Sequence, residues 1–367
     1  MKKILLLLLA VVVAIILPVI ILQFSNDSFV ENIADTSILP KKEIFTPSPS
    51  LEEKVGQLFI IGHWSDTITS DTTKLVDDLH LGGVIIMDVV GDTRKVKGWT
   101  NEWQNVAYPT PLLIGIDQEG GIVSRLKESS FIQLAQPEIT TLDIAYETAS
   151  KRAKELSELG INNNFAPVVD QSINPDAFMY ERVFRDPVMI SSLADTMVRG
   201  YQNGGVVSTP KHYPGHPDTA DDSHITLPIL NLSEEEYRGH TEQFSELLKA
   251  GNTQMLMTAH VQVPTIDSVY PTTLSNILIT DLRTRIGYDG VIVTDDLAMQ
   301  AISDRWSYED AAVLSLQAGA DMIMLAAEPE YASSTIQAVI TAVESGELAE
   351  ERINEAYERV ILLKERL

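Results

Sequence analysis

The sequence predicts an α/β fold in which short buried strands alternate with amphipathic helices along one domain. Eight apolar runs of five to seven residues recur after residue 57, and their nearly continuous apolar character is typical of parallel strands covered on both faces. Eight such repeats, separated by helical stretches, match a closed (β/α)8 barrel of the TIM type better than an open, doubly wound sheet. The runs are residues 58–62, 83–87, 112–117, 164–170, 206–212, 255–261, 290–296 and 321–326.

Two of the stretches between these runs carry strong helix signals. Residues 142–160 have apolar side chains near the 3.6-residue period and end on a glycine. Residues 233–251 open with a serine, which is a good N-cap, followed by three glutamates, and they also close on a glycine. The chain after residue 326 has a helical pattern as well, so we expect residues 51–367 to form a single domain.

The first 24 residues are predicted to be a membrane segment rather than part of this domain. Two lysines precede residues 4–22, which carry no charge and approach the roughly 20 apolar residues that span a bilayer. Because no small-residue cleavage pattern follows, we favour an uncleaved transmembrane anchor with the body of the protein outside the cytoplasm; a cleaved signal peptide is the alternative. Residues 25–50 contain three prolines and are expected to form a flexible linker.

The overall composition restricts the partners of the protein. A formal net charge of −25 argues against nucleic acid or anionic lipid as the main partner, because both require a basic patch. The chain has no cysteine, which excludes disulfides and thiolate nucleophiles. With 44% hydrophobic and 22% charged residues, the chain has the composition of a globular protein.

Polar side chains collect at the carboxyl ends of the predicted strands, where barrels of this type carry their active sites. A charge in or next to a buried apolar run requires either an ion-pair partner or a function. A structural ion pair accounts for any one of these residues, but it accounts poorly for five strands that end in the same way. The residues are Asp117, Glu119, Asp170, Lys211, His212, His260, Asp295 and Asp296.

The loop KHYPGHPDTADDSH, residues 211–224, holds three of the seven histidines and three aspartates. A metal site is disfavoured because the histidines are spread through a proline-containing loop and Lys211 repels a cation. Phosphate binding is disfavoured because the loop has one glycine and does not resemble a glycine-rich turn into a helix. Proton transfer fits best, since Asp222 and His224 are two residues apart and can pair a carboxylate with an imidazole. We therefore expect no metal or other cofactor.

These residues also carry a family resemblance. The loop at 211–224, followed by Thr-Asp-Asp-Leu at 294–297, resembles the family 3 glycoside hydrolases, and among them the single-domain β-N-acetylglucosaminidases of bacterial cell-wall turnover. The resemblance covers about residues 50–330 and includes IDQEGG at 116–121, NFAPVVD at 164–170 and ERVF at 181–184.

The resemblance implies a role for each matching residue. It implies that Asp295 is the nucleophile, that His224 is the general acid/base and that Asp222 is the partner of His224. The residues implied to hold the sugar are Asp117, Arg125, Arg182, Lys211 and His212. The sequence departs from the family pattern at Gln118, Glu181 and Pro217, none of which is assigned to the chemistry, and Arg182 has the most altered surroundings.

Physical chemistry supports these roles independently. Retaining cleavage of a glycoside requires a carboxylate that attacks the anomeric carbon and an acid that protonates the leaving oxygen. Asp295 stands at a strand end, which holds a nucleophile rigidly, whereas its neighbour Asp296 is expected to turn away because adjacent strand residues face opposite sides. A carboxylate partner such as Asp222 would keep His224 in the correct tautomer and charge state.

The sequence therefore predicts a retaining exo-β-N-acetylglucosaminidase that acts on peptidoglycan fragments outside the cytoplasmic membrane. We expect its partners to be a carbohydrate substrate and, through the N-terminal segment, the membrane, and we expect a monomer. One alternative is a phosphorylase, because a histidine acid/base lacks the negative charge that would repel phosphate. Another is a barrel that binds wall sugars without cleaving them, although Asp222, His224 and Asp295 are all present.

Overall fold

The computed structural model describes residues 48–64, 69–88, 92–107, 109–127, 131–218 and 223–367. Eight parallel strands lie in the order β7-β6-β3-β2-β1-β10-β9-β8. The two edges of this sheet meet, because the N–H of Tyr213, beyond β7, donates to Met257 O (2.9 Å) and Ala259 N donates to Tyr213 O (2.7 Å). The strands are β1 Phe59–His63, β2 Gly83–Ile86, β3 Leu113–Ile116, β6 Asn163–Asn164, β7 Val207–Ser208, β8 Met255–Thr258, β9 Val291–Asp296 and β10 Met322–Leu325.

Each of the eight predicted apolar runs overlaps one of these strands, so the barrel prediction is confirmed. The fourth and fifth strands are much shorter than predicted, with two residues each. Pro167 and Pro210 follow them and have no N–H to donate, so the regular ladder stops. Pairing resumes beyond the prolines as isolated bridges, of which Val168 with Lys211 is one.

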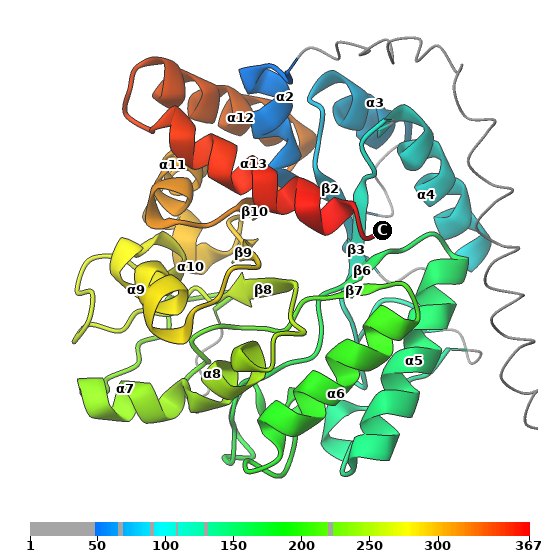
Figure 1. Ribbon diagram of the computed structural model, residues 1–367, viewed down its shortest axis with the longest axis vertical. Coiled ribbons are helices and arrows are strands. Elements are labelled where there is room, and N and C mark those ends of the chain that lie inside the picture. The colour runs from blue at the N-terminus through cyan, green and yellow to red at the C-terminus, as the bar shows by residue number, and fades with distance from the viewer. Residues whose placement is uncertain (1–47, 65–68, 89–91, 108, 128–130, 219–222) are drawn as a thin grey trace, which may run out of the picture. The chain divides into compact units, whose positions relative to one another are not determined.

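Helices surround the barrel (Figure 1). A separate two-stranded antiparallel sheet, β4 Gln118–Gly120 with β5 Val123–Ser124, follows β3. The α-helices are α2 Leu51–Gln57, α3 Thr69–Asp78, α4 Thr93–Ala107, α5 Leu142–Glu158, α6 Ile190–Asn203, α7 Glu234–His240, α8 Glu242–Lys249, α9 Asn276–Asp281, α10 Gln300–Ser303, α11 Tyr308–Ala318, α12 Pro329–Glu344 and α13 Glu350–Lys364. Shorter helical turns are η1 Gln136–Glu138, η2 Tyr180–Arg182, η3 Thr272–Leu274 and η4 Leu282–Ile286.

The helix predicted at 142–160 is α5, which ends before Gly160, a glycine with a φ of 78°. The helix predicted at 233–251 begins as expected, because Ser233 and Glu236 form a reciprocal capping box. It is interrupted at Thr241, so that α7 and α8 are separate helices. The Thr241 hydroxyl donates to Arg238 O at 3.2 Å, a local bond that competes with the regular helical pattern.

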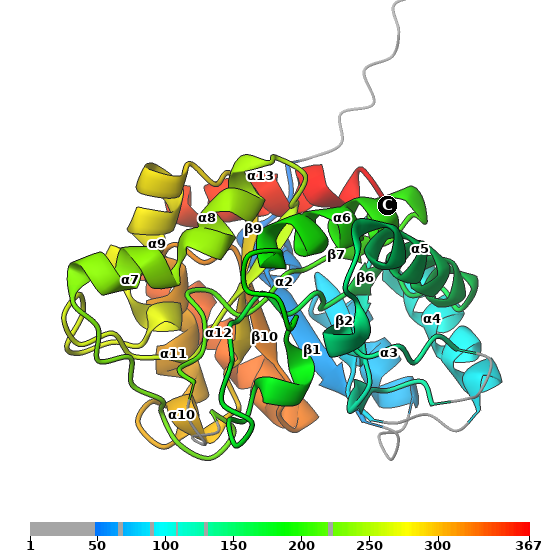
Figure 2. The same ribbon diagram turned by 90° about the horizontal axis from the view of Figure 1, so that it is seen from below.

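The two ends of the barrel differ in what covers them. Helix α13 lies across the end at which the strands begin, and it faces the viewer in Figure 1. The strands point away from α13 toward the loops on the opposite side of the molecule, which Figure 2 shows edge-on. The predicted anchor and most of the predicted linker lie outside the described residues. Within the described part of the chain, none of the helices has both the length and the apolar character needed to cross a membrane.

Candidate active site

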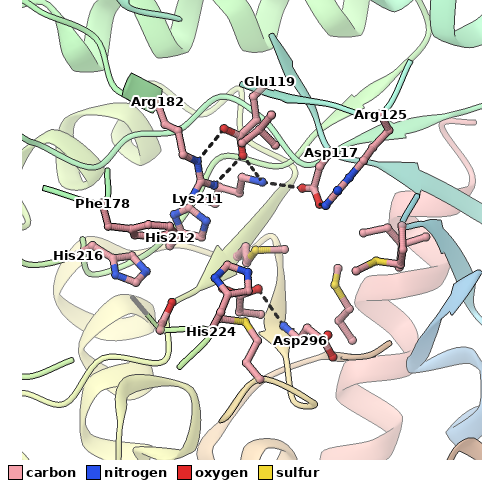
Figure 3. A pocket seen from close by; sticks show the side chains of 18 of the residues that line it. Asp117, Glu119, Arg125, Phe178, Arg182, Lys211, His212, His216, His224 and Asp296 are labelled. Carbon is pink, nitrogen blue, oxygen red and sulfur yellow. Dashed lines mark hydrogen bonds and ion pairs between the residues drawn. The ribbon is translucent and has the colours of Figure 1, made fainter. Parts of the chain in front are cut away.

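A cavity of about 490 Å³ lies at the carboxyl ends of the strands. Seven of the eight residues assigned to the site by resemblance line it, and Figure 3 shows most of them around the cavity. The eighth, Asp222, lies outside the described residues, so its pairing with His224 stays a prediction. The seven are Asp117, Arg125, Arg182, Lys211, His212, His224 and Asp295.

Lys211 lies at the centre of a charged cluster on one side of the cavity (Figure 3). Its ammonium nitrogen is 2.6 Å from Asp117 Oδ1 and 2.7 Å from Glu119 Oε1. Asp117 directly follows β3 and Glu119 belongs to β4, whereas Lys211 follows β7, so the barrel brings together residues almost one hundred positions apart. Lys211 is buried, and two carboxylates compensate the loss of its hydration.

Arg182 completes this cluster. Its Nε donates to Glu119 Oε2 at 3.0 Å and its Nη2 donates to Glu119 Oε1 at 2.7 Å, a bidentate pair. Burial alone would raise the pKa of Glu119, but Arg182 and Lys211 hold that pKa below its usual range. Glu119 is thus an ionised anchor for two cations that border the cavity. Arg182 is firmly held, despite the departure from the family pattern at the preceding residue.

Arg125 is the third cation of the cluster and is less firmly held. Its Nη2 is 3.4 Å from Asp117 Oδ2, and its side chain is 29% exposed. Together with Lys211 and Arg182 it gives the cluster three positive charges against the two negative charges of Asp117 and Glu119. An excess of donors of this kind is suited to hydrogen-bonding the hydroxyls of a polar ligand.

Asp170 fixes the beginning of the 211–224 loop. Its Oδ2 accepts hydrogen bonds from His212 Nδ1 (2.8 Å) and His212 N (3.1 Å), and its Oδ1 accepts one from His216 N (2.6 Å). Burial would raise the pKa of Asp170, but the neighbouring histidines and these bonds hold it well below its usual range. Because the carboxylate accepts from Nδ1, that nitrogen carries a proton, and Nε2 is the ring nitrogen that Asp170 does not bind.

Asp295 lies at the carboxyl end of β9 and its side chain reaches the cavity. Its Oδ1 accepts a hydrogen bond from Asp296 N at 2.9 Å. Burial would raise the pKa of this carboxyl group, but the imidazoles of His260 and His212 and the bond from Asp296 N hold it below its usual range. Asp295 is therefore an ionised carboxylate at the floor of the site.

Asp296 behaves differently from its neighbour. Its Oδ1 accepts hydrogen bonds from Ala298 N and Ala326 N, both at 2.9 Å, so its carboxyl group is directed toward the loops after β9 and β10. It still borders the cavity, because the strand ends here and the alternation of sides no longer applies. Burial raises the pKa of Asp296 to about 6.

His224 borders the same cavity, across from the Lys211 cluster (Figure 3). Its ring lies edge-on to Phe178, with 5.9 Å between the ring centroids. Phe178 is also edge-on to His216 (6.1 Å) and lies under the guanidinium of Arg182 (5.4 Å). Phe178 therefore links the loop that carries His224 to the cluster that carries Arg182. Phe178 lies in an irregular segment without periodicity, so no residue pattern marks it in the sequence.

His260 is a strand-end residue that the sequence drew attention to but that is not among the residues lining the cavity. Its Nε2 is 2.9 Å from Asp296 O and its Nδ1 is 2.9 Å from Thr273 Oγ1. Burial lowers the pKa of His260, whereas the charge of Asp295 and the bond to Asp296 O act in the opposite direction. His260 lies beneath the site and contacts the strand end that carries Asp295 and Asp296.

The family profile described as Glycosyl hydrolase family 3 N terminal domain matches residues 50–363. The chain belongs to glycoside hydrolase family 3. The loop at 211–224 and the end of β9 both lie within the matched region.

Several similar proteins are named as hexosaminidases or as a beta-N-acetylglucosaminidase. The chain is 32% identical to Beta-hexosaminidase A of Pseudoalteromonas piscicida over 335 residues, which cover 82% of this chain and 56% of the relative. It is 31% identical to Beta-hexosaminidase LpqI of Mycobacterium tuberculosis over 332 residues, which cover 86% of this chain and 83% of the relative. The solved structure of a family 3 beta-N-acetylglucosaminidase from Paenibacillus sp. str. FPU-7 is 37% identical, with a TM-score of 0.82. The match covers 87% of this chain and 63% of that one, so this chain spans under two thirds of two of these three proteins.

Proposed function

We propose that this protein is a retaining exo-β-N-acetylglucosaminidase that removes terminal β-linked N-acetylglucosamine from a glycan. The observation that carries the proposal is the meeting of an ionised carboxylate, Asp295, and an imidazole, His224, in one cavity with three cationic side chains. The names of the family 3 relatives support N-acetylhexosamine as the sugar. The volume of about 490 Å³ lies within the range of small-ligand sites.

In the first step, Asp295 attacks the anomeric carbon while His224 gives a proton to the leaving oxygen, which departs as an alcohol. The bond from carbon to the leaving oxygen breaks as the bond from carbon to the Asp295 oxygen forms. In the second step, His224 takes a proton from a water molecule, which attacks the same carbon and releases Asp295 as a carboxylate. Two inversions leave the anomeric configuration unchanged.

The charged cluster serves to hold the sugar during both steps. Lys211, Arg182 and Arg125 provide hydrogen-bond donors, and Asp117 provides carboxylate oxygens that accept from hydroxyl groups. His212 presents the nitrogen that does not bond Asp170. Because these groups are fixed by one another before a ligand arrives, little ordering is needed on binding.

We also propose that the enzyme acts on peptidoglycan fragments from the outer side of the cytoplasmic membrane, held there by the N-terminal segment. The support is the uncharged stretch at residues 4–22 after two lysines. An inserted segment should keep the enzyme with membranes through a high-salt wash, because ions do not screen apolar insertion. Release by salt, or a mature N-terminus near residue 25, would contradict an anchor.

The activity is tested with an aryl β-N-acetylglucosaminide and the variants Asp295→Ala and Asp295→Asn. Both should lose hydrolysis while keeping the thermal unfolding midpoint within a few degrees of the wild type. Asp289→Asn is the matched control, since this exposed aspartate stands just before the other end of β9. Turnover by the Asp295 variants would refute the assigned nucleophile, and formation of sugar 1-phosphate when phosphate is added would indicate a phosphorylase.

A further inference from the structure

The end of strand β9 lacks backbone support on one side. The ladder between β8 and β9 has its last pair at Thr258 and Thr294, and β9 continues to Asp296. On the other side, the register between β10 and β9 shifts between Met322 and Met324. The two aspartates of the site thus lie where regular sheet pairing is incomplete, so other groups have to fix their positions.

The side chain of His260 supplies the bond that the ladder lacks. His260 follows β8, and its Nε2 is 2.9 Å from the carbonyl oxygen of Asp296. A carbonyl oxygen has no proton, so Nε2 is the donor. On the other side of the ring, Nδ1 is 2.9 Å from Thr273 Oγ1, and the Thr273 hydroxyl donates to Ala259 O at 2.9 Å. His260 and Thr273 are both fully buried.

Asp296 connects the hydrogen bond from His260 to the nucleophile, Asp295. Its N–H donates to Asp295 Oδ1 at 2.9 Å, and its own Oδ1 accepts from Ala298 N and Ala326 N. Its carbonyl oxygen accepts from both His260 and Met299 N (3.0 Å). The N–H, the carbonyl oxygen and Oδ1 of Asp296 are therefore all bonded, and the N–H fixes the orientation of the attacking carboxylate.

We propose that His260 is a positioning residue for the nucleophile: its buried imidazole, held between Thr273 Oγ1 and the carbonyl oxygen of Asp296, fixes the end of β9 so that Asp295 faces the anomeric carbon. This inference rests on the proposed function and identifies a residue, outside the cavity, on which that function depends. A misplaced nucleophile lowers the rate of the chemical step, whereas the Lys211 cluster that binds the sugar is left intact.

The test compares kcat and KM of three variants on an aryl β-N-acetylglucosaminide. His260→Leu removes both hydrogen bonds and should lower kcat about 10²-fold with little change in KM, the loss expected of a displacement near the reacting atoms. His260→Gln keeps a donor near the position of Nε2 and should recover most of kcat. Thr273→Val removes the hydroxyl that bonds Nδ1 of His260 and should cost about fivefold in kcat, the equivalent of one hydrogen bond.

A second measurement separates positioning from a general loss of structure. Binding of free N-acetylglucosamine to each folded variant should match that to the wild type, because His260 does not border the cavity. A kcat of His260→Leu within twofold of the wild type would overturn the proposal, and so would equal losses in His260→Leu and His260→Gln. If His260→Leu does not fold, the kcat and KM values of Thr273→Val and His260→Gln test the proposal instead. An inactive wild type would instead refute the proposed function.

Discussion

The two ends of the barrel both hold a buried carboxylate between several cations, but they use it differently. At the carboxyl ends of the strands, Glu119 binds Arg182 and Lys211 beside an open cavity. At the amino ends, Asp321 is fully buried and each of its oxygens accepts from the surrounding chain. The same ion-pair chemistry therefore positions the side chains of a binding site at one end and stabilises the packing of the fold at the other.

The partners of Asp321 show which elements of the fold it holds together. Arg352 and Arg359, both on α13, lie 2.6 Å and 3.1 Å from Asp321 Oδ1. Arg283 and the backbone N–H of Ile292, at the start of β9, bind Oδ2. One carboxylate thus joins the C-terminal helix to two strands. The comparison teaches that the surroundings of a buried charged residue indicate its role. A residue that borders a cavity is indicated to function in binding or catalysis, whereas one enclosed by packed side chains is indicated to stabilise the fold.

The largest effect is expected at the active-site end. His224→Ala should slow cleavage of substrates with poor leaving groups by about 10²–10⁴-fold, because no acid then protonates the departing oxygen. Activated aryl substrates need little protonation and should lose less in the first step. Rates on both substrate types, with and without azide, provide the measurement.

Azide should partly rescue the second step in this variant, because it attacks without a general base. Asp222→Ala should act in the same direction but more weakly, since it removes only the partner of the imidazole. Equal losses on both substrate types with no azide rescue would mean that His224 binds the substrate rather than transferring a proton.

At the opposite end, Asp321→Asn should lower the free energy of unfolding by about 3–5 kcal/mol, because three arginines lose their shared carboxylate. Activity per folded molecule should be unchanged at low temperature. Denaturant unfolding and kcat measured on the same samples test this. Glu147→Gln is the control, since its pair with Lys151 is exposed and should contribute less than about 1 kcal/mol. If Asp321→Asn lost activity without losing stability, Asp321 would not have the purely structural role that separates the two ends of the barrel.

A smaller effect is expected at Lys364, also at the amino ends of the strands. Its ammonium is buried and donates to Gln57 Oε1 at 2.6 Å, and burial lowers its pKa to about 7. The unfolded chain keeps this proton up to about pH 10.4, whereas the folded chain releases it near pH 7, so stability should rise as pH increases between these values.

Lys364→Met should remove that rise and add about 1–3 kcal/mol of stability at pH 7. Unfolding in denaturant at pH 7 and pH 9 measures both effects. Lys249→Met, at an exposed position at the end of α8, should leave the pH dependence as it is in the wild type. A pH dependence that survives in Lys364→Met would assign it to other groups.

The sequence was sufficient for the architecture because buried parallel strands are continuous apolar runs. It predicted all eight strands, but it overestimated the fourth and fifth, where Pro167 and Pro210 interrupt the ladder. It also missed the break at Thr241, since a side-chain hydrogen bond to a nearby carbonyl leaves no periodic signal. Local competition of this kind depends on geometry that a residue pattern does not contain.

The site was predicted where a motif marks it and missed where only folding creates it. The loop at 211–224 and the Asp295 strand end were visible as unusual polar residues. The anchoring of Arg182 by Glu119 joins residues 63 positions apart, and Phe178 reaches the cavity from an irregular segment. The Asp321 cluster could not be predicted from the sequence either, because its arginines come from η4 and α13.

The central claim is that Asp295 forms a covalent bond to the sugar. The most direct measurement is mass spectrometry of peptides from enzyme treated with an activated fluorosugar, whose glycosyl–enzyme intermediate breaks down slowly. The account predicts that one sugar is attached to the peptide that contains Asp295, and that none is attached in Asp295→Ala. Attachment to another carboxylate, or turnover with inverted anomeric configuration and no adduct, would contradict it.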